Sequence, residues 1–149
     1  MIIFQNLSRI IIPSRKDYID NIISRIVAEI NSLYLKIIEI DSGESEFLSS
    51  FGFGLSLAID EALKNAIEHG NKSEEKKLVK MEYYIDADKI QIKVKDQGDG
   101  FDYNSYLNAS SAPEAEAGRG LLLIRNFMDE VTWNDPGNEI TMIKTRKSA

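Results

Sequence analysis

The 149-residue chain contains no cysteine and only one histidine. The lack of cysteine excludes disulfides, thiolate metal sites and a cysteine nucleophile, and it fits a protein of the reducing cytoplasm. A single histidine is too few for a histidine-rich metal site, and the sequence has no G-x-S-x-G or H-E-x-x-H motif. The common hydrolase and metalloprotease centres are therefore excluded.

The chain also lacks long apolar runs and basic blocks. No apolar run approaches the roughly 20 residues that a transmembrane helix needs, and residues 1–16 do not have the pattern of a signal peptide. A net charge of −6 without a basic block argues against a nucleic-acid-binding surface. With 43% hydrophobic and 28% charged residues, the composition is that of a globular protein. We predict one domain over residues 1–149, located in the cytoplasm, with no membrane or direct nucleic-acid partner.

The order of the predicted elements indicates an α+β protein. Apolar periodicity predicts strands in 1–12, a helix over about 15–33, a polar joint at 41–50, a long helix ending at 70, strands in 78–86 and 89–96, a helix over about 120–128, and a strand pair after 129. Because the strands come in hairpins and the helices are not regular crossovers, we predict a two-layer α/β sandwich. Its sheet is mixed but mostly antiparallel, with the helices on one face.

The first polar cluster is "EALKNAIEHGNK", residues 61–72. Glu61, Asn65 and His69 recur every four residues along the edge of an apolar helical stripe, so their side chains stack on one face. Such a row can line the mouth of a cavity under the sheet. Alternatively, Glu61 and Asn65 form a solvated rim and His69 interacts with the negative end of the helix dipole.

The second cluster is "DQGDG", residues 96–100, at the end of an alternating strand. Asp96 is in phase with the apolar residues of that strand, so its carboxylate is predicted to point inward. An inward carboxylate needs hydrogen-bond donors, and a ligand amine could supply one. Gly98 and Gly100 allow the backbone to approach a ligand closely. The alternative is an ordinary Asp-Gly turn.

The third cluster is "AGRGLLLIRNF", residues 117–127, which follows a long segment without periodicity. Gly118 and Gly120 open an amphipathic helix whose free amides attract phosphate, and Arg119 adds positive charge. Alternatively, the two glycines belong to a flexible loop without a ligand. Neither a P-loop nor a Rossmann fingerprint is present, so a phosphate site would be of another kind.

Together the three clusters resemble the N, G1 and G2 boxes of the GHKL ATPases: E-x-x-x-N on a long helix, D-x-G-x-G after a strand, and G-x-G at a later helix. This superfamily includes gyrase, a heat-shock chaperone, histidine kinases and the MutL proteins. Within it, the chain resembles the small bacterial anti-sigma factors that are also serine kinases. The stretches "IIIPSRKDYIDNI", "EALKNAIEHGNK" and "GRGLLLIRNFMDEV" carry this likeness, which covers nearly the whole chain.

The resemblance implies ATP and Mg²⁺ as cofactors and gives three residues a role in the chemistry. Glu61 would be the catalytic base that takes the proton from the attacking hydroxyl. Asn65 would be the Mg²⁺ ligand, and Asp96 would accept a hydrogen bond from the adenine amino group.

The remaining implied site residues surround the nucleotide. Residues 101–117 would form an ATP lid. Gly98 and Gly100 would make room for the nucleotide. The residues implied to close over its phosphates are Gly118, Arg119, Gly120 and Leu121. Thr141 is the candidate for a threonine beside the adenine.

The resemblance further implies a homodimeric anti-sigma factor with serine/threonine kinase activity. Such a protein binds a sigma factor and phosphorylates a STAS-domain antagonist in a partner-switching module. The alternative is a nucleotide-gated scaffold of the same fold, with a non-sigma partner and little kinase activity. A two-component histidine kinase needs a phospho-accepting histidine on a dimerisation helix pair, and His69, at the end of the N-box helix, does not meet that need.

Overall fold

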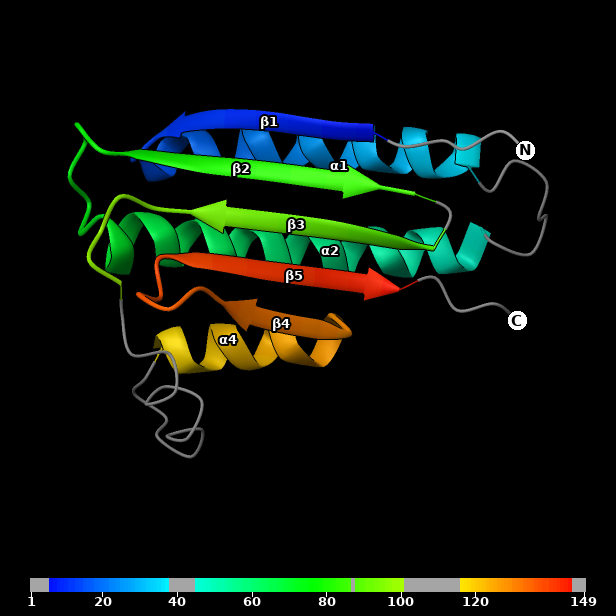
Figure 1. Ribbon diagram of the computed structural model, residues 1–149. Helices are drawn as coiled ribbons and strands as arrows, with labels where there is room; N and C mark the ends of the chain where they lie inside the picture. Colours follow the sequence, from blue (N-terminus) through cyan, green and yellow to red (C-terminus); the bar gives the residue numbers. More distant parts are fainter. Residues whose placement is uncertain (1–5, 38–44, 87, 101–115, 146–149) are drawn as a thin grey trace.

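The computed structural model describes residues 6–37, 45–86, 88–100 and 116–145 as two layers, with a sheet covered on one face by helices (Figure 1). The sheet has five strands in the order β1-β2-β3-β5-β4. The strands are β1 (Asn6–Pro13), β2 (Leu78–Ile85), β3 (Lys89–Lys95), β4 (Glu130–Trp133) and β5 (Glu139–Thr145). This confirms the predicted fold class, although every pairing of these strands is antiparallel, so no parallel pair occurs among them.

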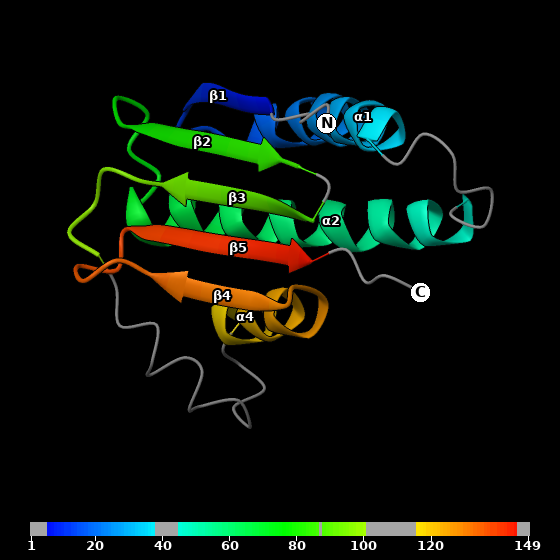
Figure 2. The same ribbon diagram turned by 45° about the vertical axis from the view of Figure 1, so that its right-hand side comes forward.

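The helical layer consists of η1 (Lys16–Tyr18), α1 (Ile19–Ile37), α2 (Ser45–Asn65), η2 (Ala66–Gly70) and α4 (Glu116–Phe127). Figure 2 shows α1 behind β1 and β2, α2 along the middle of the sheet, and α4 beneath β4. No helix among the described residues combines the length and the apolar character that crossing a membrane requires.

Two predicted boundaries differ from the structure. The predicted polar joint at 41–50 is wrong for 45–50, because α2 begins at Ser45; residues 41–44 lie outside the described residues. Helix α4 begins at Glu116 rather than near residue 120. Of the predicted lid, 101–115 lie outside the described residues, while 116 and 117 are helical.

The core lies between the sheet and the helices. On β2 and β3, alternate residues are buried, and the register pairs them across the two strands. The apolar stripe of α2 packs against this face through Leu55, Ile59 and Leu63, all fully buried. The other face of the sheet has no helix over it among the described elements and carries a polar row, one residue from each of four neighbouring strands: Arg9, Glu82, Lys93 and Thr141. Successive residues of β5 alternate between these two faces, so only every second residue of β5 faces the helices.

The end of the long helix is unusual and holds three segments together. Its last turn, η2, is a π-helical turn, and Asn71 N donates to Ala66 O at 2.8 Å. The Asn71 side chain is fully buried: its Nδ2 donates to Leu78 O (3.1 Å), and its Oδ1 accepts from Gln97 N (2.7 Å). Single π-helical turns occur often at functional sites. Here Asn71 joins the helix end to the start of β2 and to the residue that follows Asp96.

Candidate functional site

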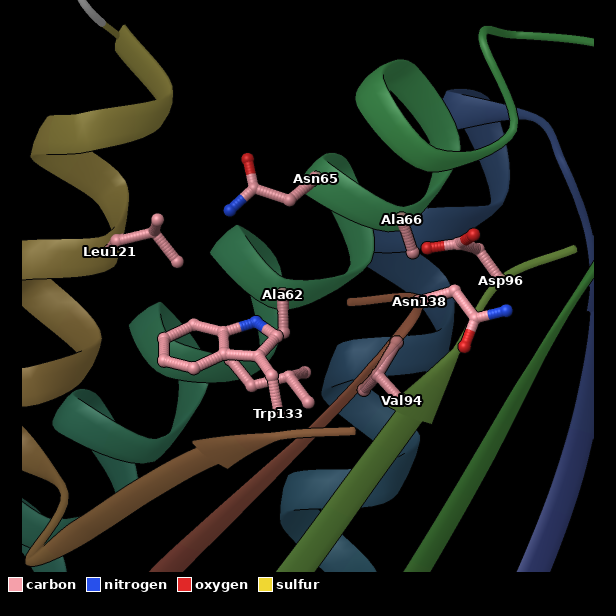
Figure 3. Close-up of a pocket in the computed structure, with 9 residues that line it drawn as sticks. Ala62, Asn65, Ala66, Val94, Asp96, Leu121, Trp133 and Asn138 are labelled. Atoms are coloured by element: carbon pink, nitrogen blue, oxygen red, sulfur yellow. The ribbon is translucent and has the colours of Figure 1, made fainter. Parts of the chain in front are cut away.

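A small pocket lies where the end of α2, the end of β3 and the first turns of α4 meet (Figure 3). The space between its lining side chains is about 20 Å³, which is room for about one water molecule. It is lined by Ala62, Asn65, Ala66, Val94, Asp96, Leu121, Trp133, Asn138 and Ile140. The pocket therefore brings together residues from all three predicted clusters, among them Asn65, Asp96 and Leu121.

Asp96 is buried at the sheet side of the pocket, with 7% of its surface exposed, as the strand alternation predicts. Burial raises the pKa of its carboxyl, and the Gly98 N–H and the positive charge of Lys77 partly offset that rise. Among the described residues, the one hydrogen bond to the carboxylate comes from Gly98 N, at 2.8 Å to Oδ1. An ionised carboxylate can accept about four hydrogen bonds, so Asp96 keeps capacity for a donor on a ligand.

Glycines place the Asp96 carboxylate against the helix end. A Cβ on Gly70 would overlap that carboxylate, and a Cβ on Gly98 would overlap the Gly70 carbonyl oxygen. Gly100 has a positive φ of 93°, and a Cβ there would overlap the Pro136 carbonyl oxygen. Gly98 and Gly100 therefore bring protein segments together, and neither lines the pocket. The pattern of the sequence did not identify the steric role of Gly70.

Asn65 occupies the opposite side of the pocket, at the end of α2. Its Nδ2 is buried and has no hydrogen-bond partner within the described part of the chain. Buried polar atoms of this kind are uncommon, and each requires an explanation. A half-turn of the amide exchanges oxygen and nitrogen, so either atom can face a ligand.

The Asn65 amide fits a magnesium ion shared with a phosphate group. Mg²⁺ prefers oxygen ligands, keeps several waters and takes few ligands from the protein. In the described residues no cluster of three or more acidic or histidine side chains could hold a metal by itself. One amide oxygen is consistent with a metal that is held mainly by the nucleotide.

Glu61 lies one helical turn before Asn65 and faces α4. A Cβ on Gly120 would overlap the Glu61 carboxylate, so this carboxylate lies directly against the first turns of α4. Gly118, Arg119 and Gly120 all lie within those turns. The predicted base and the predicted phosphate-binding segment are thus neighbours, and Gly120 is the residue that permits their approach.

The sequence also matches a known protein family. Residues 13–144 match the family described as histidine kinase-like ATPase domain. This chain belongs to that family. The match confirms the predicted GHKL resemblance at the level of the family.

Curated relatives of this ATPase domain have the name serine-protein kinase RsbW. The protein from Staphylococcus epidermidis is 38% identical over 98 residues, which cover 59% of this chain and 62% of the relative. The Staphylococcus aureus protein is 35% identical over 98 residues, with the same coverage. The Listeria innocua protein is 34% identical over 99 residues, covering 60% and 63%. The chain thus spans less than two thirds of the length of these curated relatives.

Two residues of the ATPase domain that the sequence analysis singled out lie away from the pocket. Thr141 is paired with Lys93 on the face of the sheet opposite the helices, and its neighbour Ile140 lines the pocket instead. Thr141 therefore does not line this pocket, and its predicted contact with adenine stays a prediction. His69 is half-buried on η2 and does not line the pocket either.

Asn138 is a polar pocket residue that the sequence analysis missed. Its carbonyl oxygen accepts from Asp96 N (2.9 Å), and its Nδ2 donates to Gly98 O (3.3 Å). The Asn134 side-chain oxygen accepts from the backbone of the turn and holds Asn138 in place. The sequence "NDPGN" signals this turn, but only the sheet register shows that the turn lies next to Asp96.

Proposed function

We propose that this protein is a cytoplasmic ATP-dependent serine/threonine protein kinase that works with Mg²⁺. The observation that carries the proposal is the convergence of two incompletely bonded polar groups on one pocket. Asp96 has a buried carboxylate with capacity for a ligand donor, and Asn65 has a buried amide nitrogen without a partner in the described chain. An adenine amino group and a phosphate-bound metal ion would satisfy both.

The pocket walls suit a nucleobase on one side and phosphates on the other. Asp96 would accept a hydrogen bond from the adenine amino group, between the apolar side chains of Val94 and Ile140. Asn65 would hold Mg²⁺, which when bound neutralises charge on the phosphates. Gly118 and Arg119, in the first turns of α4, would lie over the phosphates.

Glu61 would act on the hydroxyl that receives the phosphoryl group. Its carboxylate would accept the hydroxyl proton as the new bond forms between that oxygen and the γ-phosphorus and the bond to the ADP oxygen breaks. Phosphoryl transfer depends mainly on positioning and on charge neutralisation. A carboxylate held against the N-terminal turns of α4 is in the right region for this step.

The partners are proposed from resemblance. Relatives named serine-protein kinase support a protein hydroxyl as the acceptor. Likeness to the anti-sigma kinases supports a STAS-domain antagonist as the phosphorylated protein, a sigma factor as the inhibited one, and a homodimer as the working form.

Substitution of Asp96 by asparagine should change ATP affinity and thermal stability in opposite directions. Asparagine can still accept from the Gly98 N–H, but it loses the charge that favours an adenine donor, so ATP affinity should fall about 10- to 100-fold. The folded-state pKa of the Asp96 carboxyl is raised, so its ionised form destabilises the native state at neutral pH. Asp96→Asn should therefore raise Tm at pH 7, and this gain should shrink as the pH falls toward the unfolded-state pKa of about 3.9.

Calorimetric titration with ATP and thermal melts at several pH values measure both effects. Equal ATP affinities of the variant and the wild type would refute the adenine role of Asp96. A lower Tm at pH 7 would show instead that the carboxylate supports the fold.

Substitution of Gly120 by alanine tests whether phosphotransfer needs the Glu61 carboxylate in its position against α4. The new methyl group would displace the Glu61 carboxylate, which is the far end of a flexible side chain and can shift without unfolding the protein. Alanine is also about 1 kcal/mol better than glycine inside a helix. We expect kcat for phosphotransfer to fall at least about 10-fold, with Tm maintained. Leu123→Ala, at an exposed position on the same helix, is the matched control; an unchanged kcat in Gly120→Ala would contradict the assigned position of Glu61.

The experiment that tests the kinase itself is phosphotransfer from γ-labelled ATP·Mg²⁺ into a lysate of the source cell. Labelling of one small protein on serine or threonine would support the kinase and identify its substrate. Absence of labelled protein, despite measurable ATP binding, would contradict the kinase and favour a nucleotide-gated binding protein.

A further inference from the structure

The pocket is narrow, with room for about one water molecule (about 20 Å³) between its lining side chains. The bulk of those side chains therefore decides which base can lie against Asp96.

Most of the wall is held firmly. Ala62 and Ala66 have no side-chain rotamers to change, and Val94, Leu121 and Ile140 are buried in the core. The Asp96 carboxylate and the Asn138 amide both take part in hydrogen bonds. These side chains cannot withdraw without disrupting the packing or the bonds around them.

Trp133 differs from these residues in three ways. It is the largest side chain in the lining and the one apolar lining side chain that is only partly buried. It is the last residue of β4, a four-residue strand at the edge of the sheet. Figure 3 shows its indole between Leu121 of α4 and Ala62 of α2, across the floor of the pocket.

We infer that Trp133 sets the size of the base pocket, which makes it a specificity-determining residue for the base. This inference rests on the proposed function, since it names the wall against which that ATP would bind. The broad indole ring takes up space at the edge of the base that lies against it. Purines that carry a further bulky group at that edge are then selected against.

The chain has one tryptophan, so emission excited at wavelengths that tyrosine does not absorb reports on this side chain alone. Titration of the wild-type protein with ATP should change the emission in a saturable manner, with a midpoint that matches the calorimetric Kd. An unchanged emission at ATP concentrations that saturate the calorimetric signal would overturn the inference.

Variants test base specificity with ATP analogues that carry a bulky base substituent, 2-methylthio-ATP and 8-bromo-ATP. The wild type should bind at least one of these analogues about 10-fold or more weakly than ATP, and Trp133→Ala should reduce this ratio of Kd values about 10-fold. Trp133→Phe keeps an aromatic ring, so its ratio should lie between those of the wild type and Trp133→Ala. It provides the comparison if the alanine variant does not fold. Leu123→Ala, exposed on α4 and outside the lining, should keep the wild-type ratio.

The outcomes separate this inference from the proposed function. If ATP binds by calorimetry while the emission and the analogue ratios stay unchanged, the inference alone is wrong. If ATP does not bind the wild type at all, the proposed function is wrong, and the inference is overturned with it.

Discussion

Replacement of Glu61 by glutamine is expected to lower phosphotransfer by at least about 100-fold, because general-base catalysis contributes about 10²- to 10⁴-fold to such reactions. Glutamine has the shape of glutamate and can occupy the same space beside Gly120. It cannot accept the proton of an attacking hydroxyl. ATP affinity should therefore stay within about twofold of the wild type, and the loss should appear in kcat.

The matched control for this variant is Glu68→Gln. Glu68 lies on η2, near Glu61 in the chain, and its carboxylate forms a salt bridge with Lys16. The same chemical change at Glu68 should leave phosphotransfer close to that of the wild type. If Glu61→Gln keeps its phosphotransfer activity, a group other than Glu61 removes the proton from the attacking hydroxyl.

Replacement of Asn65 by alanine is expected to remove the part of ATP binding that depends on Mg²⁺. Asn65 is the one candidate metal ligand among the residues that line the pocket on the α2 side. We expect ATP affinity in the presence of Mg²⁺ to fall at least about 100-fold. The difference in ATP affinity between the variant and the wild type should become smaller when Mg²⁺ is removed with a chelator.

This loss should not come from unfolding. The Asn65 Nδ2 has no hydrogen-bond partner in the described chain, so its removal leaves no partner unsatisfied. Tm should be nearly unchanged. Asn126→Ala makes the same chemical change at an exposed position of α4 and should bind ATP·Mg²⁺ like the wild type. Equal affinity of Asn65→Ala and the wild type for ATP·Mg²⁺ would remove Asn65 from the metal site.

Local periodicity was enough to predict most of the fold. Residues in β2 and β3 alternate because one face of the sheet packs on helices and the other has no helix over it among the described elements. The α2 stripe repeats every three to four residues for the same reason. Periodicity does not show where a polar segment joins a helix, and for this reason the start of α2 at Ser45 was missed.

The parts of the site that the sequence did not predict depend on contacts between distant segments. A strand register that differs by one residue exchanges the two faces of a sheet, and for β5 this puts Ile140 in the pocket and Thr141 outside it. The fit of Asp96 beside Gly70 joins segments far apart in the chain. Trp133 appears in the sequence only as an aromatic residue in a short strand, and its place in the pocket becomes evident once α4 is packed against α2.

The measurement that tests the central claim most directly is a calorimetric titration of the wild-type protein with ATP, with and without Mg²⁺. The account predicts saturable binding of one nucleotide per chain, with weaker binding when Mg²⁺ is withheld and with GTP failing to compete at equal concentration. A titration without measurable binding at millimolar ATP, in the presence of Mg²⁺, would contradict the assignment of this pocket to a nucleotide.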